Sequence, residues 1–231
     1  MKAPVICIDG PAASGKTTIA RLLAEKLGYF YLDTGVLYRA ITWVALQRNI
    51  DPGDGEALGR LAQDLAIEVK PAPSGDPRQT IVLADGEDVS LAIRTPKVDA
   101  NVSEVSAHPS VRTALIAVQR SIAEKGGVIL AGRDAGTVIW PESKVKIFLT
   151  ASDEERARRR VKQAKEQGID LEYQLVLDEL RRRDQYDSGR AVAPLRVAPD
   201  ATVLDTTNLS IAEVLNEILG LVCRLTGVCV H

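Results

Sequence analysis

Residues 5–18 read VICIDGPAASGKTT, and this stretch decides the fold of the chain. Its first five residues are mostly apolar and β-prone, which predicts a strand buried on both faces. Residues 19–27 carry apolar side chains at helical spacing. Between these two segments, the pattern G-x-x-x-x-G-K-[ST] is formed by Gly10, Gly15, Lys16 and Thr17. Strand, glycine-rich loop and helix in this order predict a phosphate-binding loop.

The residue types in this loop suit the binding of a triphosphate. Glycine lets backbone N–H groups turn inward around phosphate oxygens, where a Cβ would block the approach. Lys16 would place its ammonium group on the β- and γ-phosphates, and Thr17 would give its hydroxyl to Mg²⁺. The N-terminus of the following helix adds partial positive charge to the same place.

Composition places the chain among ordinary globular proteins. It has 231 residues, of which 45% are hydrophobic and 26% charged, so one domain with sub-lobes is expected. The net charge of −2 argues against nucleic acid as a main partner. Any basic function must therefore come from local clustering of Lys and Arg.

The cysteines predict neither a structural zinc site nor a disulfide framework. Cys7, Cys223 and Cys229 have no paired spacing, and Cys7 falls in the first predicted strand. That strand begins within five residues of Met1, which leaves no room for a signal peptide, and no run of 18 apolar residues occurs. We therefore expect a reduced, cytoplasmic protein with no membrane partner.

Short apolar stretches alternate with helical patterns along the chain. Besides residues 5–9, strands are predicted at residues 29–32, 128–131, 145–150 and 201–205. A helix is predicted after Asp33-Thr34-Gly35, and others at residues 56–65, 97–105, 111–123, 173–186 and 211–225. This order predicts the α/β class, with a doubly wound, five-stranded parallel sheet covered on both faces and ligands at the carboxyl ends of its strands.

Two local segments have a less regular pattern. Residues 67–95 alternate and turn in the manner of a small antiparallel hairpin or a three-stranded insert. The corner at Asp33-Thr34-Gly35 ends a predicted strand at a helix N-terminus, where anions bind well. Simple capping of that helix by Asp33 or Thr34 explains the same residues equally well.

A strongly basic excursion lies between the fourth and fifth predicted strands. Ser152 and Glu155 form a capping-box pattern. The helix that follows carries Arg156, Arg158, Arg159, Arg160, Lys162 and Lys165. A second helix ends in the sequence RRRD at residues 181–184. Charge runs are commonly solvated faces, but a basic helix pair opposite a phosphate-binding loop, in a slightly acidic chain, favours a lid that covers phosphates.

Other motifs narrow the class of phosphate-binding protein. The Asn-Lys-x-Asp element of GTPases is absent, and the strand at residues 128–131 ends in Ala-Gly-Arg-Asp rather than in the acids typical of motor ATPases. A kinase acting on a phosphate acceptor needs arginines to neutralise both polyanions. It needs no general base, because the acceptor phosphate is largely deprotonated near pH 7. We expect His108 and His231 to be structural or surface residues.

Several motifs together carry a resemblance to a known family. They read IDGPAASGKTT, LDTGVLYR, GEDVSLAIRT, NVSEVSAHPSVR, AGRDAGTVIWP, KIFLTASDEERARRR and RRRDQYDSGRAVAPL. In this order, from residue 5 to about residue 209, they are similar to bacterial-type cytidylate kinases. The resemblance implies a P-loop nucleoside monophosphate kinase that transfers the γ-phosphoryl group of ATP to CMP or dCMP in pyrimidine nucleotide metabolism, giving ADP and CDP or dCDP.

The resemblance also implies which residues bind the two nucleotides. ATP would be bound by Gly10, Pro11, Ala12, Ala13, Ser14, Gly15, Lys16, Thr17 and Thr18. CMP would be bound by Thr34, Tyr38, Arg39, Ser103, Arg112, Arg133, Asp134, Arg183, Asp187 and Arg190. Catalysis would depend on Lys16, Arg133, Arg159, Arg160 and Arg183.

Within the CMP set, different residues would have different tasks. Arg39, Arg133 and Arg183 would grip the acceptor phosphate. Ser103, Arg112 and Asp134 would read the cytosine edge, because a carboxylate accepts from the exocyclic amine that uracil lacks. The sugar hydroxyls would be held by Asp187 and Arg190. Arg159 and Arg160 would belong to a lid that closes over the transferring phosphate and excludes water.

The resemblance implies a single kinase domain over residues 1–231, with Mg²⁺ as cofactor on Thr17 and ATP, and with a monomer as the expected state. Its core would comprise residues 1–38, 113–151 and 191–231, its monophosphate-binding lobe residues 39–112 and its lid residues 152–190. Two positions depart from the family pattern. Thr34 stands where Ser is frequent, and Ala131 where an acid is frequent, so Asp33 or bound water would have to replace that acid.

Two alternatives remain open from the sequence. Another small P-loop kinase, acting on UMP or thymidylate, would use the same chemistry on a different acceptor. A nucleic-acid-binding P-loop module is a different class, and only two Phe residues are present to form a stacking platform.

Overall fold

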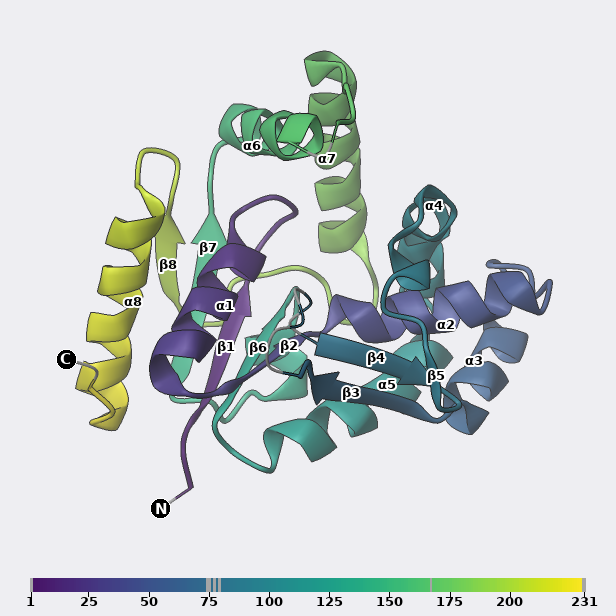
Figure 1. Ribbon diagram of the computed structural model, residues 1–231, viewed down its shortest axis with the longest axis horizontal. Helices are drawn as coiled ribbons and strands as arrows, with labels where there is room; N and C mark the ends of the chain where they lie inside the picture. Colours follow the sequence, from purple (N-terminus) through teal and green to yellow (C-terminus); the bar gives the residue numbers. More distant parts are fainter. Residues whose placement is uncertain (1, 74–75, 77, 79, 167, 230–231) are drawn as a thin grey trace.

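Five parallel strands form the central sheet of the molecule. The computed structural model of the chain describes residues 2–73, 76, 78, 80–166 and 168–229. The strand order is β2-β6-β1-β7-β8, and all carboxyl ends lie at one edge (Figure 1). The strands are β1 (Val5–Asp9), β2 (Phe30–Asp33), β6 (Val128–Gly132), β7 (Val145–Thr150) and β8 (Thr202–Asp205). The predicted α/β class is confirmed.

The sheet is buried on both faces, as the apolar strands predict. Side chains of β1 alternate: Ile6 and Ile8 pack under helices α1 (Lys16–Leu27) and α8 (Ile211–Thr226). Val5 and Cys7 face the opposite layer, which contains the end of helix α5 (Pro109–Ala123) and the π-helical turn η2 (Ala135–Ile139). Burial on both faces holds the strand ends in fixed positions for a ligand site.

A second lobe grows from one side of the sheet. Its antiparallel sheet consists of β3 (Ile67–Pro71), β4 (Thr80–Ala84) and β5 (Glu87–Asp88), which confirms the three-stranded form of the insert. Its helices are α2 (Gly35–Gln47), α3 (Gly55–Asp64), η1 (Ala92–Arg94) and α4 (Pro96–Val105). These elements share one apolar cluster with the start of α5, including Leu37, Leu58, Val82 and Leu115, so the lobe has a core of its own.

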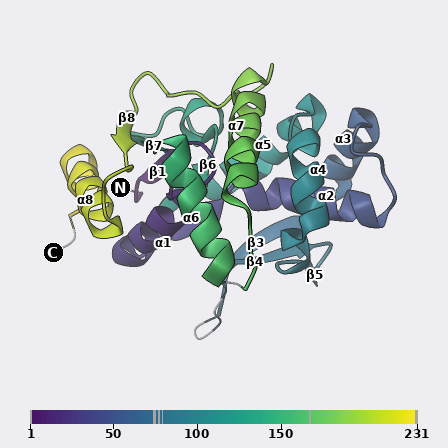
Figure 2. The ribbon, with the colours of Figure 1, turned by 90° about the horizontal axis from the view of Figure 1, so that it is seen from above.

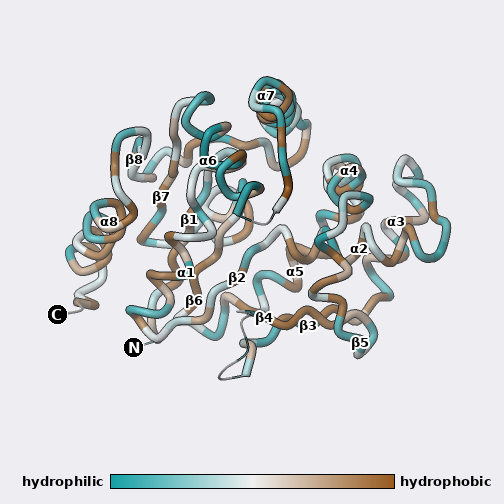
Figure 3. Tube along the Cα trace, turned by 45° about the horizontal axis from the view of Figure 1, so that its top comes forward, coloured by the Kyte–Doolittle hydropathy of each residue, from teal (hydrophilic) through white to brown (hydrophobic). Residues whose placement is uncertain are grey.

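Helices α6 (Asp153–Glu166) and α7 (Tyr173–Gly189) lie above the carboxyl edge of the sheet (Figures 1 and 2). They pack together through Ala157, Val176, Leu177 and Leu180. Val161 of α6 packs against this cluster, while most other residues of α6 are charged or polar (Figure 3). Half of the expected capping box forms: the amide of Glu155 donates to Ser152 Oγ at 3.2 Å. The Glu155 carboxylate binds Arg159 at 2.9 Å, so its bond back to the Ser152 amide, which donates to Thr207 Oγ1, is not made.

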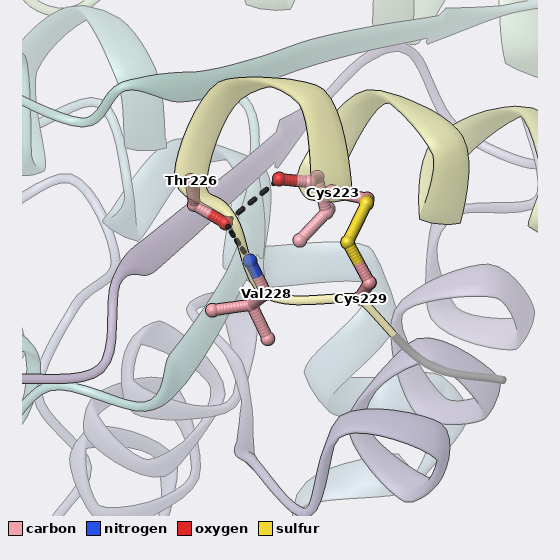
Figure 4. The surroundings of a disulfide bond; sticks show 5 residues. Cys223, Thr226, Val228 and Cys229 are labelled. Carbon is pink, nitrogen blue, oxygen red and sulfur yellow. Dashed lines mark hydrogen bonds between the residues drawn. A yellow bond between two sulfur atoms is a disulfide. The ribbon is translucent and has the colours of Figure 1, made fainter.

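The expectation of a chain without disulfides is wrong. Cys223 in the last turn of α8 is bonded to Cys229, with the Cα atoms 4.5 Å apart (Figure 4). The chain turns back at Gly227, which has a left-handed φ of 74° and ends the helix. Thr226 Oγ1 donates to Val222 O at 2.7 Å and accepts from the Val228 amide at 3.2 Å, which fixes the turn (Figure 4). The sequence feature that could have indicated this disulfide is Gly227, which lies between the two cysteines and lets the chain turn back. None of the helices in the described part of the chain is long and apolar enough to cross a membrane.

We expect the disulfide to stabilise the end of α8 modestly. Closing a loop between cysteines six positions apart restricts the unfolded chain by about 2 kcal/mol. Thermal and urea unfolding of the native protein, with and without dithiothreitol, should show a loss of up to this size. The double variant Cys223→Ser, Cys229→Ser should unfold like the reduced protein and not respond to the reductant. A native protein with three titratable thiols and no response would contradict the assignment.

Candidate active site

The loop between β1 and α1 is built for close approach of backbone to ligand. Gly10 has a φ of 150°, and a Cβ there would lie 2.0 Å from the Leu149 carbonyl oxygen of β7, so only glycine fits. Gly15, with a φ of 93°, turns the chain into α1. Lys16 Nζ donates to Pro11 O at 2.5 Å, so the side chain of Lys16 bridges the two ends of the loop.

The first turn of α1 is open to an anion. The N-cap Gly15 has no side chain to cap the helix, and the first turn contains no acidic residue. Its backbone N–H groups therefore remain available to a phosphate, whose charge the helix dipole favours. Thr17 is exposed in the same turn. ATP binding by residues 10–18 stays a prediction, with backbone N–H groups and the Thr17 hydroxyl available to it.

Three cations from separate elements are coupled electrostatically beside this loop. Lys16 from α1, Arg133 from the loop after β6 and Arg183 from α7 are close enough for their charges to act on one another. Burial lowers the pKa of Lys16, and the charge of Arg133 lowers that pKa further. Burial and then Arg133 likewise lower the pKa of Arg183, whose buried Nε has no hydrogen-bond partner among the described residues. Such like charges are stabilised by an anion bound between them.

Two carboxylates hold the arginines around this cluster. Arg133 Nε donates to Asp187 Oδ2 at 2.9 Å, which links the β6 loop to α7. Arg39 of α2 pairs with Asp99 of α4 at 2.6 Å and donates to Ile93 O at 3.1 Å. The Arg39 charge contributes to the lowered pKa of Arg183, so the two guanidinium groups are within electrostatic reach.

A buried ion pair lies on the lobe side of the cluster. Arg112 and Asp134 are bonded to each other and are 1% and 3% exposed. Arg112 also donates to Ser106 O at 3.1 Å and stacks on the Tyr38 ring at 5.2 Å. Its partner oxygen is Asp134 Oδ2, and no bond to Oδ1 is found in the described part of the chain. Tyr38 therefore supports Arg112, and Asp134 retains an acceptor oxygen.

The sugar-binding candidates lie at the end of α7. Arg190 Nη1 is 3.7 Å from Asp187 Oδ1, and its Nη2 donates to Ala193 O at 3.3 Å. Burial lowers the pKa of Arg190. A hollow of about 390 Å³ opens beside it, lined by Ala107, Pro109, Gln185, Tyr186, Gly189, Arg190, Ala191 and Val192. Arg190 therefore borders a space between the lobe and α7.

Two candidates for contact with CMP have other neighbours. Thr34 is buried, and its hydroxyl donates to Ala131 O at 3.1 Å, tying β2 to β6. The corner is capped by Asp33 instead, whose Oδ1 accepts from the Gly35 amide at 2.9 Å. Ser103 lies half-buried on α4, one turn before the Ser106 carbonyl that binds Arg112. Neither residue contacts the cation cluster in this structure.

The two arginines predicted for the lid lie in different surroundings. Arg159 donates to Thr206 O at 2.6 Å and to Thr206 Oγ1 at 3.0 Å, and a Cβ on Gly15 would lie 3.8 Å from its Nη1. It therefore lies over the phosphate-binding loop. Arg160 is exposed on α6 and is not brought into the cluster. His108 is structural as expected, with Nε2 2.8 Å from Pro52 O, whereas His231 lies outside the described residues.

Sequence analysis missed two buried charges. Arg156, taken as one member of a charge run, is 3% exposed and donates to Ala12 O of the phosphate-binding loop at 3.1 Å. It also pairs with Asp153 and Asp184 at 2.5 and 2.6 Å, which ties α6 to α7. Asp9 ends β1 with a 5% exposed carboxylate. Its position at the end of an apolar strand was the available signal.

The sequence of this chain is similar over nearly its whole length to a known family of proteins. A family model described as cytidylate kinase matches residues 6–224. The cytidylate kinase of Anoxybacillus flavithermus is 50% identical over 217 residues, covering 94% of this chain and 95% of that protein. The cytidylate kinase of Bacillus subtilis is 48% identical over 214 residues, covering 93% and 94%.

The fold has a solved counterpart at low sequence identity. An uncharacterized protein from Eubacterium ventriosum superimposes with a TM-score of 0.52 at 12% identity, covering 96% of this chain and 99% of that one. This similarity concerns the fold only. The family match over nearly the whole length, together with the relatives near 50% identity, shows that this chain belongs to the cytidylate kinase family.

Proposed function

We propose that the chain transfers the γ-phosphoryl group of ATP to CMP or dCMP, giving ADP and CDP or dCDP for pyrimidine nucleotide metabolism. One observation carries the proposal: Lys16 of the phosphate-binding loop, Arg133 and Arg183 are within electrostatic reach of one another, and Arg133 is adjacent in sequence to Asp134 of the buried pair. A donor phosphate on the loop and an acceptor phosphate below the pair would meet at these cations. Family membership supports the same reaction.

Each residue group has a task in the transfer. The loop and the first turn of α1 orient the triphosphate, and Lys16 neutralises its terminal charge. Arg39, Arg133 and Arg183 hold the acceptor phosphate, whose oxygen attacks without a general base. Asp187 and Arg190 bind the sugar at the end of α7. Positioning and charge neutralisation together supply the catalysis.

The acceptor base would be read by the buried pair. The free oxygen of Asp134 can accept from the exocyclic amine of cytosine, and Arg112 can donate to the ring carbonyl. UMP and thymidylate offer a carbonyl in place of the amine and would face Asp134 unfavourably. The structure therefore favours CMP over the alternative acceptors.

The donor set suits Mg²⁺ bound chiefly by the nucleotide. No cluster of three metal-binding side chains occurs within the described ranges. Thr17 offers an exposed hydroxyl beside Lys16, and Asp33 offers a carboxylate whose charge reaches Lys16. Mg²⁺ commonly binds through substrate phosphates and one or two such groups. Thr17, with Asp33 through water, would hold the ion, which neutralises phosphate charge when bound.

During the proposed reaction, a lid would close over the nucleotides bound between the core and the monophosphate lobe. We infer a core of about residues 1–38, 113–151 and 191–231, a monophosphate lobe of residues 39–112 and a lid of residues 152–190. Arg159 lies beside Gly15 at the root of the lid, while the exposed Arg160 would enter the site on closure. All these residues come from one chain, so a monomer suffices for the reaction.

The acceptor defines the first test. With saturating Mg-ATP, ADP release should be fast with CMP and dCMP and slow with UMP and dTMP, because uracil and thymine offer Asp134 a carbonyl where cytosine offers an amine. AMP also carries an exocyclic amine, but on a larger purine ring, so it tests whether the site discriminates by the size of the base. A coupled assay with all five acceptors at equal concentration measures this directly. If another acceptor gave the highest activity, the assignment of Asp134 to cytosine recognition would be wrong. If ADP release did not depend on any acceptor, the result would favour the nucleic-acid-binding alternative.

Removal of the loop ammonium should lower turnover nearly to zero. Lys16→Ala should lower kcat by about 100- to 1,000-fold, because the charge developing between the phosphates loses its partner. The matched control is Lys26→Ala, an exposed lysine in the last turn of the same helix, which should behave as wild type. Steady-state kinetics with CMP and a melting curve for each variant would decide the matter. Undiminished turnover in Lys16→Ala refutes the role.

Because Asp134 belongs to a buried ion pair, its substitution by Ala and by Asn should have different effects on stability. Asp134→Ala leaves Arg112 buried without a partner and should lower the free energy of unfolding by about 3–5 kcal/mol, measured in urea. Asp134→Asn keeps the shape and can still accept from Arg112, but it removes the negative charge of the pair, so we expect a smaller loss of stability than in Asp134→Ala, together with a defect in substrate binding. We expect KM for CMP to rise by about 30- to 1,000-fold with erosion of the preference over UMP. Unchanged CMP kinetics would exclude Asp134 from base reading.

A further inference from the structure

Asp9 makes a pair of contacts that no step described so far uses. It is the last residue of β1 and stands directly before Gly10. Its Oδ1 accepts from the Ala135 amide at 2.8 Å, and its Oδ2 accepts from the Gly136 amide at 2.8 Å. Both oxygens of one buried carboxylate thus hold two successive N–H groups more than 120 residues away in sequence. Bonds of this charged kind are stronger and more directional than neutral ones.

These contacts fix the segment that carries two site residues. Gly132 ends β6 and is paired in register with the Asp9 backbone. Ala135 begins the π-helical turn η2 and is bound by the Asp9 side chain. Arg133 and Asp134 lie between these two anchors, so Asp9 holds the segment at both ends. The same residue joins this segment to the phosphate-binding loop, which starts at the next position.

We propose that Asp9 is a positioning residue for the acceptor nucleotide, which sets Arg133 and Asp134 at the correct distance from the phosphate-binding loop. The inference rests on the proposed function, in which Arg133 holds the acceptor phosphate and Asp134 reads the base. Asp9 itself touches neither nucleotide. It acts through the amides of Ala135 and Gly136.

The surroundings of Asp9 support a role in geometry rather than in packing. Asp134 on the β6 loop, Lys16 on α1, Lys146 on β7 and the neighbouring Cys7 are the titratable groups that face it. Lys146 Nζ is bonded to Asp200 at 2.7 Å, so its charge is already paired. Burial raises the pKa of Asp9 to about 6, against the effect of the two amides. Burying a carboxylate is unfavourable unless it is hydrogen-bonded, and the two bonds from the Ala135 and Gly136 amides offset that burial.

The test separates the acceptor from the donor. Asp9→Asn keeps the size of the side chain but turns an NH₂ group toward one of the two amides, so one bond is lost. At pH 8, where the native carboxylate is ionised, KM for CMP should rise by about 10- to 100-fold. KM for ATP, and the Kd for ATP measured by calorimetry without CMP, should change by less than about threefold, because ATP loses no contact.

A second variant approaches the same bond from the other side. A Cβ on Gly136 would lie 3.4 Å from Asp9 Oδ2 and 3.2 Å from the Lys146 side chain, so Gly136→Ala should displace the amide and raise KM for CMP in the same way. Asp205→Asn is the matched control. Asp205 also ends a parallel strand of this sheet, but its carboxylate binds Thr207 of its own loop. Its KM for CMP should stay within about twofold of wild type.

Hydrogen exchange of the Ala135 and Gly136 amides gives a readout that needs no substrate. Their protection should fall by at least about tenfold in Asp9→Asn, while the strand amides of β6 keep theirs. Unchanged protection, or an equal loss of affinity for ATP and CMP, overturns the proposal, since the latter would place the defect in the phosphate-binding loop. A wild-type protein without CMP-dependent turnover refutes the proposed function instead, and hydrogen exchange still decides the role of Asp9.

Discussion

Electrostatic repulsion among one buried and two half-buried cations is the constraint on which this structure depends. Lys16, Arg133 and Arg183 are brought together by a helix, a strand-end loop and a lid helix, and burial adds to the cost of their charges. Only a well-packed scaffold can hold like charges this close. The sheet, buried on both faces, supplies that scaffold. Polyanions bound between the cations convert the repulsion into attraction, so the energy stored in the fold becomes affinity for phosphates.

Carboxylates pair with the arginines in and around this cluster and fix their positions. Asp187 accepts from Nε of Arg133, and no bond to the two outer nitrogens of Arg133 is found among the described residues, whereas Asp99 and the Ile93 carbonyl each accept from one outer nitrogen of Arg39. Deeper in the fold, Asp134 neutralises Arg112, and two acids neutralise Arg156. Breaking any buried pair leaves an isolated charge, which is far costlier than losing a surface pair. The pairs therefore fix the relative positions of lobe, lid and loop.

The regular parts of the molecule could be predicted because their signals are local. Apolar strands and a glycine-rich loop indicate a parallel sheet with a phosphate site; the structure confirms the sheet and has the loop running from β1 into the uncapped start of α1. What remained hidden depends on distant partners. The roles of Asp9 and Arg156 follow from backbone groups across the fold, and the Cys223–Cys229 bond from a turn at Gly227. The Thr34 hydroxyl, similarly, is bound to a carbonyl 97 residues away. Periodicity carries no information on such contacts.

In the proposed reaction, donor and acceptor phosphates meet at one cluster of cations. A ligand that joins adenosine to cytidine through a chain of five phosphates tests it most directly, by titration calorimetry. We predict one site per chain, tighter binding than for the matching adenosine–adenosine ligand, and a marked loss of affinity in Arg183→Ala. Two independent sites, or equal affinity for the two ligands with no effect of Arg183→Ala, would contradict the account.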